Sequence, residues 1–161
     1  MIENYIVEYP NFYVPTEDLF NYQDGHKEYK ENVHFKTQHN LDTASECKFF
    51  DLVTKDCKSA NILLDLVKGD NYKFTKVLAG GVMPPHTDPL RTGVLMIPLT
   101  EEPSPIVFYE NNRKIFSHKY VCPTLINAKI KHGVPEVKKD RIFLQINFVQ
   151  SWDNLKKMRL N

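Results

Sequence analysis

Short apolar stretches that end at Pro, Gly or Asn follow one another through the second part of the chain, residues 71–150. Stretches of about four to eight residues of this kind are typical of β-strands. They predict eight strands, at Tyr72–Ala79, Val82–His86, Thr92–Leu99, Ile106–Glu110, Lys114–His118, Thr124–Asn127, His132–Glu136 and Arg141–Val149. Asn111 and Asn112 predict a hairpin turn between two of them, because asparagine tolerates positive φ. Eight short strands at a spacing of about ten residues are typical of a barrel or a two-sheet jelly roll.

The last predicted strand alternates between two kinds of side chain. One face carries four apolar residues, Ile142, Leu144, Ile146 and Phe148, and the other carries Arg141, Phe143, Gln145 and Asn147. Successive side chains of a strand point to opposite faces of the sheet. The alternation therefore predicts an apolar face covered by helices and a more polar face turned toward a cavity.

Residues 1–70 mix charged and apolar positions without clean alternation, and we expect a mixed helical region that packs on one sheet. Pro15–Phe20 predicts the start of a helix, because its acidic residues fall in the first turn, where the helix dipole stabilises them. A second helix is predicted over about residues 43–67, with a possible break near Lys58. Its residues at helical spacing are Phe49, Phe50, Val53 and Cys57 before the break, then Ile62, Leu63 and Leu66, with Ser59 as a candidate cap. Asn61–Val67 also fits a strand, so both interpretations stay open there.

The composition indicates a single domain, residues 1–161, with 42% hydrophobic residues available for a core. Lys and Arg total 21 against 20 Asp and Glu, so charge gives no reason to expect nucleic acid or an anionic membrane as a partner. No apolar run approaches the roughly 18 residues of a membrane helix, and the first residues lack a signal-peptide pattern. The three cysteines form no CxxC motif and are expected to be thiols in a reducing cytoplasm.

The segment Met83–Pro89 has the composition of half a metal site. His86 and Asp88 are two residues apart, so their side chains point to the same side of an extended backbone. The prolines around them keep the segment extended and prevent a helix. A neutral imidazole and an ionised carboxylate on one face provide two ligands, and a third from another strand would complete the facial triad that suits non-haem Fe(II).

His132 is the candidate third ligand, because it lies in a separate predicted strand, within His132-Gly133-Val134-Pro135. Arg141 begins the last strand nine residues later and points, by the alternation, toward the predicted cavity. A guanidinium there can bind a carboxylate through two parallel hydrogen bonds. Taken singly, each residue has an ordinary explanation: a turn-forming Asp, a surface His or a solvated Arg. The ordered set is what indicates a metal site beside an anion site.

His86-Thr87-Asp88, His132-Gly133-Val134 and Arg141 resemble the HxD…H…R signature of the 2-oxoglutarate and Fe(II)-dependent dioxygenases. The resemblance covers about residues 72–149 and extends to small prolyl and aspartyl/asparaginyl hydroxylase-like members. It implies a mainly β fold, a double-stranded β-helix (jelly-roll) core. It also implies that His86, Asp88 and His132 ligate Fe(II) and that Arg141 binds the distal carboxylate of 2-oxoglutarate.

The resemblance implies an enzyme that uses O2 and 2-oxoglutarate to hydroxylate a C–H bond, with release of succinate and CO2 and with ascorbate as a possible reductant. The implied substrate is a protein or peptidyl amino acid of prolyl or aspartyl/asparaginyl type, with a small molecule as the alternative. The length is similar to that of small phage or bacterial members, which implies a bacterial or phage-infected cytoplasm. The rival class is a non-enzymatic metal-binding jelly-roll module, which would have no need of Arg141.

Four further residues are candidates for binding the cofactor, and each has a structural alternative. Arg91 would bind a cofactor or substrate carboxylate, or be a solvated charge at the pocket rim. Asn127 would orient a metal ligand, or form a turn. Met96 and Tyr109 would line the 2-oxoglutarate pocket, or belong to the core.

The other histidines, His26, His34, His39 and His118, are expected to be surface or hydrogen-bonded structural residues. Lys129, Lys131, Lys138 and Lys139 flank His132 and Arg141, and would form either a basic rim or a set of solvated charges. Trp152 follows the last strand and is expected to pack against the edge of the sheet.

Overall fold

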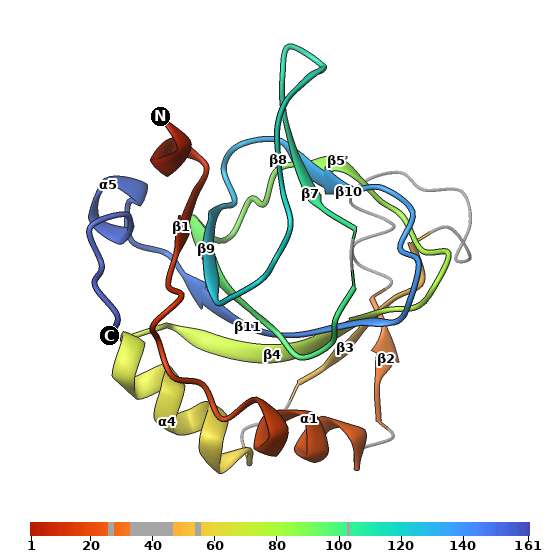
Figure 1. The fold of residues 1–161 in the computed structure, drawn as a ribbon, viewed down its shortest axis with the longest axis vertical. Coiled ribbons are helices and arrows are strands. Elements are labelled where there is room, and N and C mark those ends of the chain that lie inside the picture. Colours follow the sequence, from red (N-terminus) through yellow and green to blue (C-terminus); the bar gives the residue numbers. More distant parts are fainter. Residues whose placement is uncertain (26–27, 33–46, 54–55, 103) are drawn as a thin grey trace.

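The computed structural model, which describes every residue except 26–27, 33–46, 54–55 and 103, contains two antiparallel β-sheets that face each other across a central space (Figure 1). The larger sheet has the strand order β1-β9-β6-β11-β4-β3-β2 and the smaller sheet β5-β10-β7-β8. The strands of the larger sheet are β1 (Ile6–Glu8), β2 (Lys30–Glu31), β3 (Phe49–Leu52), β4 (Asn71–Val77), β6 (Gly93–Pro98), β9 (Thr124–Asn127) and β11 (Arg141–Phe148). Those of the smaller sheet are β5 (Met83–His86), β7 (Ile106–Glu110), β8 (Arg113–His118) and β10 (His132–Val134). Two facing sheets with this non-sequential order confirm the predicted jelly roll.

The eight strands predicted between residues 71 and 150 are all present, with ends that differ by a few residues. The hairpin between β7 and β8 turns at Asn111 (φ 48°) and Asn112 (φ 61°), which confirms the predicted turn. The three short strands β1, β2 and β3 come from the first part of the chain, at positions where the sequence predicted no strand.

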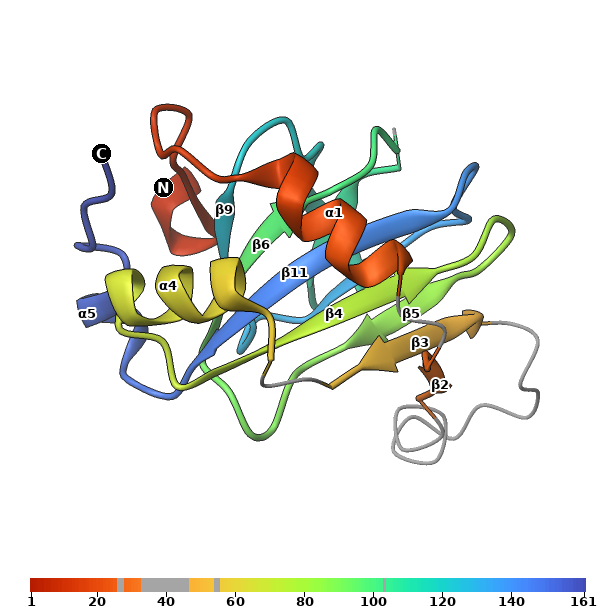
Figure 2. The same ribbon diagram turned by 90° about the horizontal axis from the view of Figure 1, so that it is seen from below.

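The helices cover the outer face of the larger sheet, as Figure 2 shows for α1 (Thr16–Asp24) and α4 (Lys58–Val67). The main core lies between them and the sheet, and it includes the four apolar residues Ile142, Leu144, Ile146 and Phe148 of β11. On the inner face, Arg141, Phe143, Gln145 and Asn147 line the cavity between the sheets. The two faces of the last strand are therefore used as the alternation predicted.

The predicted helix over residues 43–67 is only partly correct. Residues 43–46 and 54–55 lie outside the described residues, and Phe49–Leu52 forms strand β3, paired antiparallel with β4. In β3 the end residues Phe49 and Leu52 are buried at 7% and 4% exposure. A run this short fits either the helical or the strand period. Pairing with β4 gives its backbone N–H and C=O groups hydrogen-bond partners, and a short helix at this position would leave more of them unpaired.

Helix α4 confirms the second helical piece and excludes the strand interpretation of Asn61–Val67. Its buried face differs from the predicted one, because it consists of Ala60, Leu63 and Val67, whereas Ile62 and Leu66 are 57% and 61% exposed. The predicted cap is also wrong. The N-cap is Cys57 and makes no side-chain capping bond, and Ser59 lies within the first turn.

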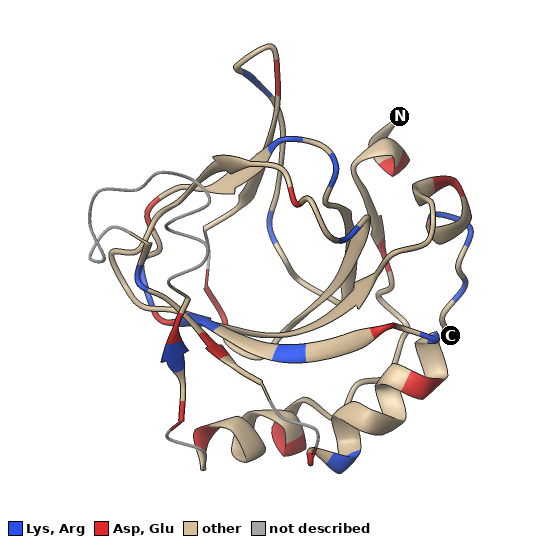
Figure 3. Cartoon of the chain, turned by 180° about the vertical axis from the view of Figure 1, so that it is seen from behind, with Lys and Arg blue, Asp and Glu red and all other residues tan. Residues whose placement is uncertain are grey.

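The remaining elements are a 3₁₀ turn at Ile2–Asn4 and the short helix α5 (Trp152–Leu155). Trp152 packs against the main core and its indole Nε1 donates to the carbonyl of Glu3 at 3.0 Å, which ties α5 to the first residues of the chain. Cys57 and Cys122 carry free thiols. None of the described helices combines the length and the apolar character that crossing a bilayer requires. Basic and acidic residues are both spread over the described chain (Figure 3).

Candidate functional site

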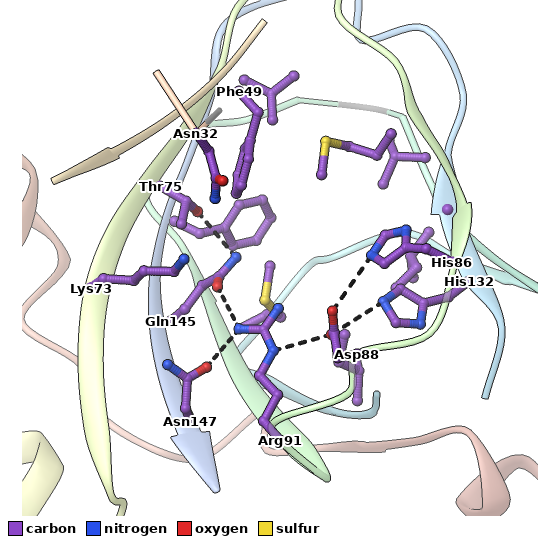
Figure 4. A pocket seen from close by; sticks show the side chains of 18 of the residues that line it. Asn32, Phe49, Lys73, Thr75, His86, Asp88, Arg91, His132, Gln145 and Asn147 are labelled. Atoms are coloured by element: carbon purple, nitrogen blue, oxygen red, sulfur yellow. Dashed lines mark hydrogen bonds and ion pairs between the residues drawn. The ribbon is translucent and has the colours of Figure 1, made fainter. Parts of the chain in front are cut away.

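His86, Asp88 and His132 meet in one cluster at the wall of the smaller sheet (Figure 4). His86 ends β5 and His132 begins β10, and the two residues are direct partners in the antiparallel pairing. The Asp88 carboxylate faces both rings, with Oδ1 3.7 Å from His86 Nε2 and Oδ2 3.6 Å from His132 Nε2. One ligand atom from each residue lies within 4.8 Å of the others. The spacing is that of groups arranged around a shared metal ion.

Backbone carbonyls fix the orientation of both imidazoles. Nδ1 of His86 lies 2.7 Å from the carbonyl oxygen of Pro84, and Nδ1 of His132 lies 2.7 Å from that of Ile130. A carbonyl oxygen only accepts, so each Nδ1 carries the proton and donates it. The Nε2 lone pairs are thereby left directed at Asp88, which is the tautomer that a metal ligand needs.

The local sequence explains why the two histidine strands approach so closely. Pro84 and Pro85 keep β5 extended, and Gly133 lets β10 lie against it. A Cβ at Gly133 would lie 2.7 Å from the carbonyl oxygen of Met83 and 3.0 Å from Pro85 N. After β5, the Asp88 amide donates to the carbonyl of Ala128 at 3.0 Å, so the carboxylate is held between the two histidines.

Asp88 is ionised in this environment. Burial of its carboxyl would raise the pKa, but the positive charge of the Arg91 guanidinium lowers it below the usual value. Arg91 Nε donates to Asp88 Oδ2 at 3.1 Å. An ionised carboxylate and two Nε2 lone pairs form the donor set of a 2-His-1-carboxylate facial triad, which suits Fe(II) and leaves coordination positions open.

A cavity of about 390 Å³ lies between the two sheets and includes the three candidate ligands in its wall. Its volume falls in the range of small-molecule sites. The strand β11 crosses the opposite wall, so Arg141 stands at one end of the cavity and Asn147 stands near the other. The candidate ligands and Arg141 therefore face one common space.

Arg141 is a buried cation that forms no ion pair with a carboxylate of the described residues. It is 5% exposed, and its single side-chain hydrogen bond is from Nη1 to the carbonyl of Ser104 at 3.3 Å. Its guanidinium lies over the rings of Tyr120 and Phe143, with the carbon Cζ 5.1 Å and 4.9 Å from their centroids. No carboxylate of a described residue lies within ion-pair distance of it. Burial lowers the pKa of Arg141, and binding an anion would relieve that cost.

Tyr120 is a site residue that the sequence analysis missed. It lines the cavity beside Arg141, and burial raises the pKa of its phenol to about 12, so the hydroxyl keeps its proton and can donate. No strand was predicted at Tyr120 and no motif includes it. Only the proximity of the end of β8 to the start of β11, which the fold creates, brings it to Arg141.

Arg91 extends from the candidate metal ligand to the amides of β11. Besides its bond to Asp88, its Nη1 donates to Gln145 Oε1 at 3.0 Å and to Asn147 Oδ1 at 2.6 Å (Figure 4). Gln145 and Asn147 donate in turn to Thr75 Oγ1 at 3.2 Å and to Asn71 Oδ1 at 2.6 Å. Arg91 is thus an internal residue of the cavity wall, and its guanidinium joins Asp88 to the amide side chains.

The structure separates the other candidate residues into two groups. Met96 lines the cavity. Asn127 and Tyr109 are not among the lining residues. Asn127 organises the turn after β9, where Oδ1 accepts from the Lys129 amide and Nδ2 donates to the carbonyl of Asn4. Tyr109 lies half-buried on β7.

The flanking lysines and histidines have separate contacts. Lys129 Nζ donates to the carbonyls of Asp88 and Pro89, each at 3.0 Å, and so holds the segment that carries Asp88. Lys131 donates to Asn112, and Lys138 pairs with Glu136. His118 lies outside the cavity, 3.6 Å from Glu8, as a structural residue, and His26, His34 and His39 lie outside the described residues.

Comparisons with known proteins give matches by structure only. No protein-family model matches the chain. A search of the curated protein sequences also finds no significant match. The solved structure of a Pseudomonas putida prolyl-4-hydroxylase aligns at a TM-score of 0.63 and 12% identity, covering 90% of this chain and 92% of that one. A 2OG-Fe(II) oxygenase family oxidoreductase from Burkholderia pseudomallei aligns at 0.60 and 13% identity, covering 91% and 84%.

A third solved structure is the Trichoplax adhaerens prolyl hydroxylase in complex with a peptide fragment of the hypoxia inducible factor oxygen degradation domain. It aligns at a TM-score of 0.65 and 14% identity, covering 96% of this chain and 88% of that one. At these identities the likeness establishes the fold. The chain therefore has the fold of these oxygenases, which confirms the resemblance that the His-Asp-His motif indicated.

Proposed function

We propose that this chain is an Fe(II)- and 2-oxoglutarate-dependent dioxygenase that hydroxylates a C–H bond. In the overall reaction the substrate, O2 and 2-oxoglutarate give the hydroxylated substrate, succinate and CO2. One observation carries the proposal: the three candidate metal ligands share a single cavity with the buried Arg141, which forms no ion pair with any described carboxylate. A metal site and a carboxylate site at the two ends of a small dicarboxylic acid are what this reaction needs.

In this proposal His86, Asp88 and His132 hold the iron. The carbonyls of Pro84 and Ile130 keep both Nε2 atoms unprotonated, and Arg91 keeps Asp88 ionised, so all three ligands are ready without rearrangement. Bound Fe(II) and 2-oxoglutarate together supply the activation of O2 that no side chain can provide. The protein supplies orientation and excludes water from the cavity.

Arg141 and Tyr120 bind the distal carboxylate of 2-oxoglutarate. Arg141 offers a fixed fork of donors, and Tyr120, protonated because burial raises its pKa, adds a neutral donor from the side. Met96, Ile106, Ile126 and Phe143 line the cavity around the chain of methylene groups. A buried guanidinium with apolar neighbours binds an anion more strongly than a solvated one, because the surrounding dielectric is low.

The non-enzymatic metal-binding alternative does not account for Arg141. A module that only holds a metal gains nothing from a buried cation at the opposite end of the cavity, and burying it costs stability. Arg141 therefore favours the enzyme. Its geometry does not distinguish a protein substrate from a small molecule.

For the substrate we propose a protein or peptidyl amino acid of prolyl or aspartyl/asparaginyl type. The likeness in fold to a prolyl hydroxylase solved with a peptide supports this class. A small-molecule hydroxylase of the same mechanism is the alternative. The free thiols of Cys57 and Cys122 support a reducing compartment such as the cytoplasm.

Succinate formation tests the proposed activity. Purified chain is incubated with Fe(II), ascorbate, O2 and 2-oxoglutarate, and succinate and CO2 are quantified. We expect slow turnover without substrate, abolished in His132→Ala and in Asp88→Ala and retained in His118→Ala, a matched change outside the cavity. The proposal would be contradicted if both ligand variants still formed succinate, or if the folded wild-type chain formed none.

A further inference from the structure

We infer that the end of the cavity farthest from Arg141 binds a carboxylate group of the substrate, an inference that rests on the proposed function. This end carries a donor wall, defined as Arg91, Lys73, Gln145 and Asn147 (Figure 4). Gln145 and Asn147 come from β11, Lys73 comes from the neighbouring β4, and Arg91 precedes β6. The donor wall thus faces the candidate iron from the larger sheet.

Each acceptor atom of the donor wall already accepts one hydrogen bond from Arg91. A guanidinium only donates, so the amide atoms that face Arg91 Nη1, Gln145 Oε1 at 3.0 Å and Asn147 Oδ1 at 2.6 Å, are oxygens. This fixes the orientation of both carboxamides. The acids nearby are engaged as well, since Asp88 binds Arg91 and Asp51 pairs with Lys73 at 3.2 Å.

Donor hydrogens remain available in the same place. Each carboxamide nitrogen carries two hydrogens, and one from each is used, by Thr75 Oγ1 for Gln145 and by Asn71 Oδ1 for Asn147. The three hydrogen bonds that Arg91 makes to described residues come from Nε and Nη1, and none of them involves Nη2. Among the described residues, the wall therefore presents N–H groups to the cavity and has few acceptors left to offer.

Because the donor wall is largely buried, its excess of N–H donors over free acceptors costs free energy. Gln145 and Asn147 are 6% and 9% exposed, and the side chains of Arg91 and Lys73 are each 23% exposed. Donors that water reaches poorly are costly unless an acceptor occupies the site. An ammonium or another donor group would compete with Arg91 and Lys73 for the acceptors that these two residues already use, whereas a carboxylate offers only acceptors to the remaining N–H groups.

The position of the wall suits a reaction near that carboxylate. Arg91 Nε lies 3.1 Å from the candidate iron ligand Asp88, so a carboxylate held by Arg91 lies next to the metal centre. A C–H bond a few atoms from the carboxylate would then face the iron. Such a carboxylate belongs either to a free acid, such as an amino acid, or to an acidic side chain of a peptide, and the test separates the two.

Side-chain amide NMR tests the inference without turnover. ¹⁵N-labelled chain is loaded with Zn(II) and saturating 2-oxoglutarate, and the NH₂ signals of Gln145 and Asn147 are followed. The probes are the common L-amino acids with their matched α-amides, and N-acetylated dipeptide amides that contain Asp or Glu with matched Asn or Gln peptides. Failure of Zn(II) or 2-oxoglutarate to bind in the first step would count against the proposed function, and the carboxylate probes are then read on the Zn(II)-free chain.

We expect at least one carboxylate probe to shift both NH₂ signals with saturation, and its uncharged partner to leave them unchanged. Gln145→Glu replaces the amide donor by a second acceptor. It should lower the affinity for that probe by about tenfold or more and leave 2-oxoglutarate binding intact. Asn154→Asp on α5 adds the same charge away from the cavity and should change neither. Equal shifts from acids and amides, or no shift from any acid, would overturn the inference even if the variant does not fold.

Discussion

The ring centroids of His86 and His132 lie 4.5 Å apart, and the two residues are directly paired between β5 and β10. This pairing brings together two residues separated by 46 positions in the sequence and aligns their Nε2 atoms with Asp88. The geometry of the candidate metal centre therefore depends on the register between β5 and β10. A shift of β10 by one residue would turn His132 to the other face of the sheet.

Gly133→Ala tests this dependence on register. A methyl group at Gly133 would lie 2.7 Å from the carbonyl oxygen of Met83, so β10 must move away from β5 and separate the histidines. We expect the affinity for Mn(II) or Fe(II) to fall by about tenfold to a hundredfold, as for other losses of ligand orientation. Calorimetric titration of the metal measures it.

The matched control is Gly25→Ala at the end of α1, where the added methyl would lie 3.4 Å or more from its nearest neighbours. That variant should bind metal like the wild-type chain. Unchanged metal affinity in a folded Gly133→Ala chain would show that the close approach of the strands is not what positions His132.

Arg141→Met tests whether Arg141 serves to bind 2-oxoglutarate or to stabilise the fold. We expect 2-oxoglutarate binding to weaken by about 2–4 kcal/mol, because a buried charge-assisted pair is lost. The chain without metal and 2-oxoglutarate should be at least as stable as wild type, because a buried cation without a carboxylate partner is replaced by an apolar side chain of similar length. Chemical denaturation and calorimetric titration give the two values. Weakened binding accompanied by a large loss of stability would assign Arg141 to the structure.

The pH dependence of stability should contain a contribution from His118. Burial lowers its pKa below the usual 6.5, although Glu8 opposes the shift. Between the lowered pKa and 6.5 the unfolded chain binds more protons than the folded chain, so the free energy of unfolding falls as pH decreases through this window. The stabilisation is complete above about pH 7 and is lost toward acid.

His118→Gln removes this titration. We expect the free energy of unfolding of the variant to fall less than that of the wild-type chain between about pH 7 and pH 5, as measured by urea denaturation at each pH. A steeper fall in the variant would mean that protonated His118 is stabilised by Glu8, and that the direction of the pKa shift is the opposite.

Two substitutions in helix α4 test which of its faces packs against the core. Leu63 is 3% exposed, whereas its neighbour Ile62 is 57% exposed. Leu63→Ala should lower the free energy of unfolding by about 2–5 kcal/mol, because it leaves a cavity in the main core. Ile62→Ala should change it by about 0.5 kcal/mol or less. Equal losses in the two variants would contradict the orientation of the helix.

The sequence predicted the jelly-roll strands and the common orientation of His86 and Asp88, because both depend on local patterns. Apolar stretches bounded by turn residues define strands whether or not their partners are known, and the alternation in β11 separates its two faces. His86 and Asp88 are adjacent on an extended segment, so their joint orientation follows from strand geometry alone.

The features that sequence analysis missed or misjudged depend on contacts between distant parts of the chain. Phe49–Leu52 fits a helical or an extended period equally well, and only the neighbouring β4 decides for a strand. Arg91 binds Gln145 and Asn147, which lie 54 and 56 residues further along the chain. Tyr120 reaches Arg141 through the closure of the two sheets, which no spacing in the sequence encodes.

Anaerobic titration with Fe(II) followed by 2-oxoglutarate tests the central claim most directly. The wild-type chain should bind one iron and then develop the visible absorption band of a 2-oxo acid chelated to Fe(II). Arg141→Met should retain the iron and require far more 2-oxoglutarate for the band, whereas Asp88→Ala should lose both. An undiminished band in Asp88→Ala, or no iron binding by the folded wild-type chain, would contradict the account.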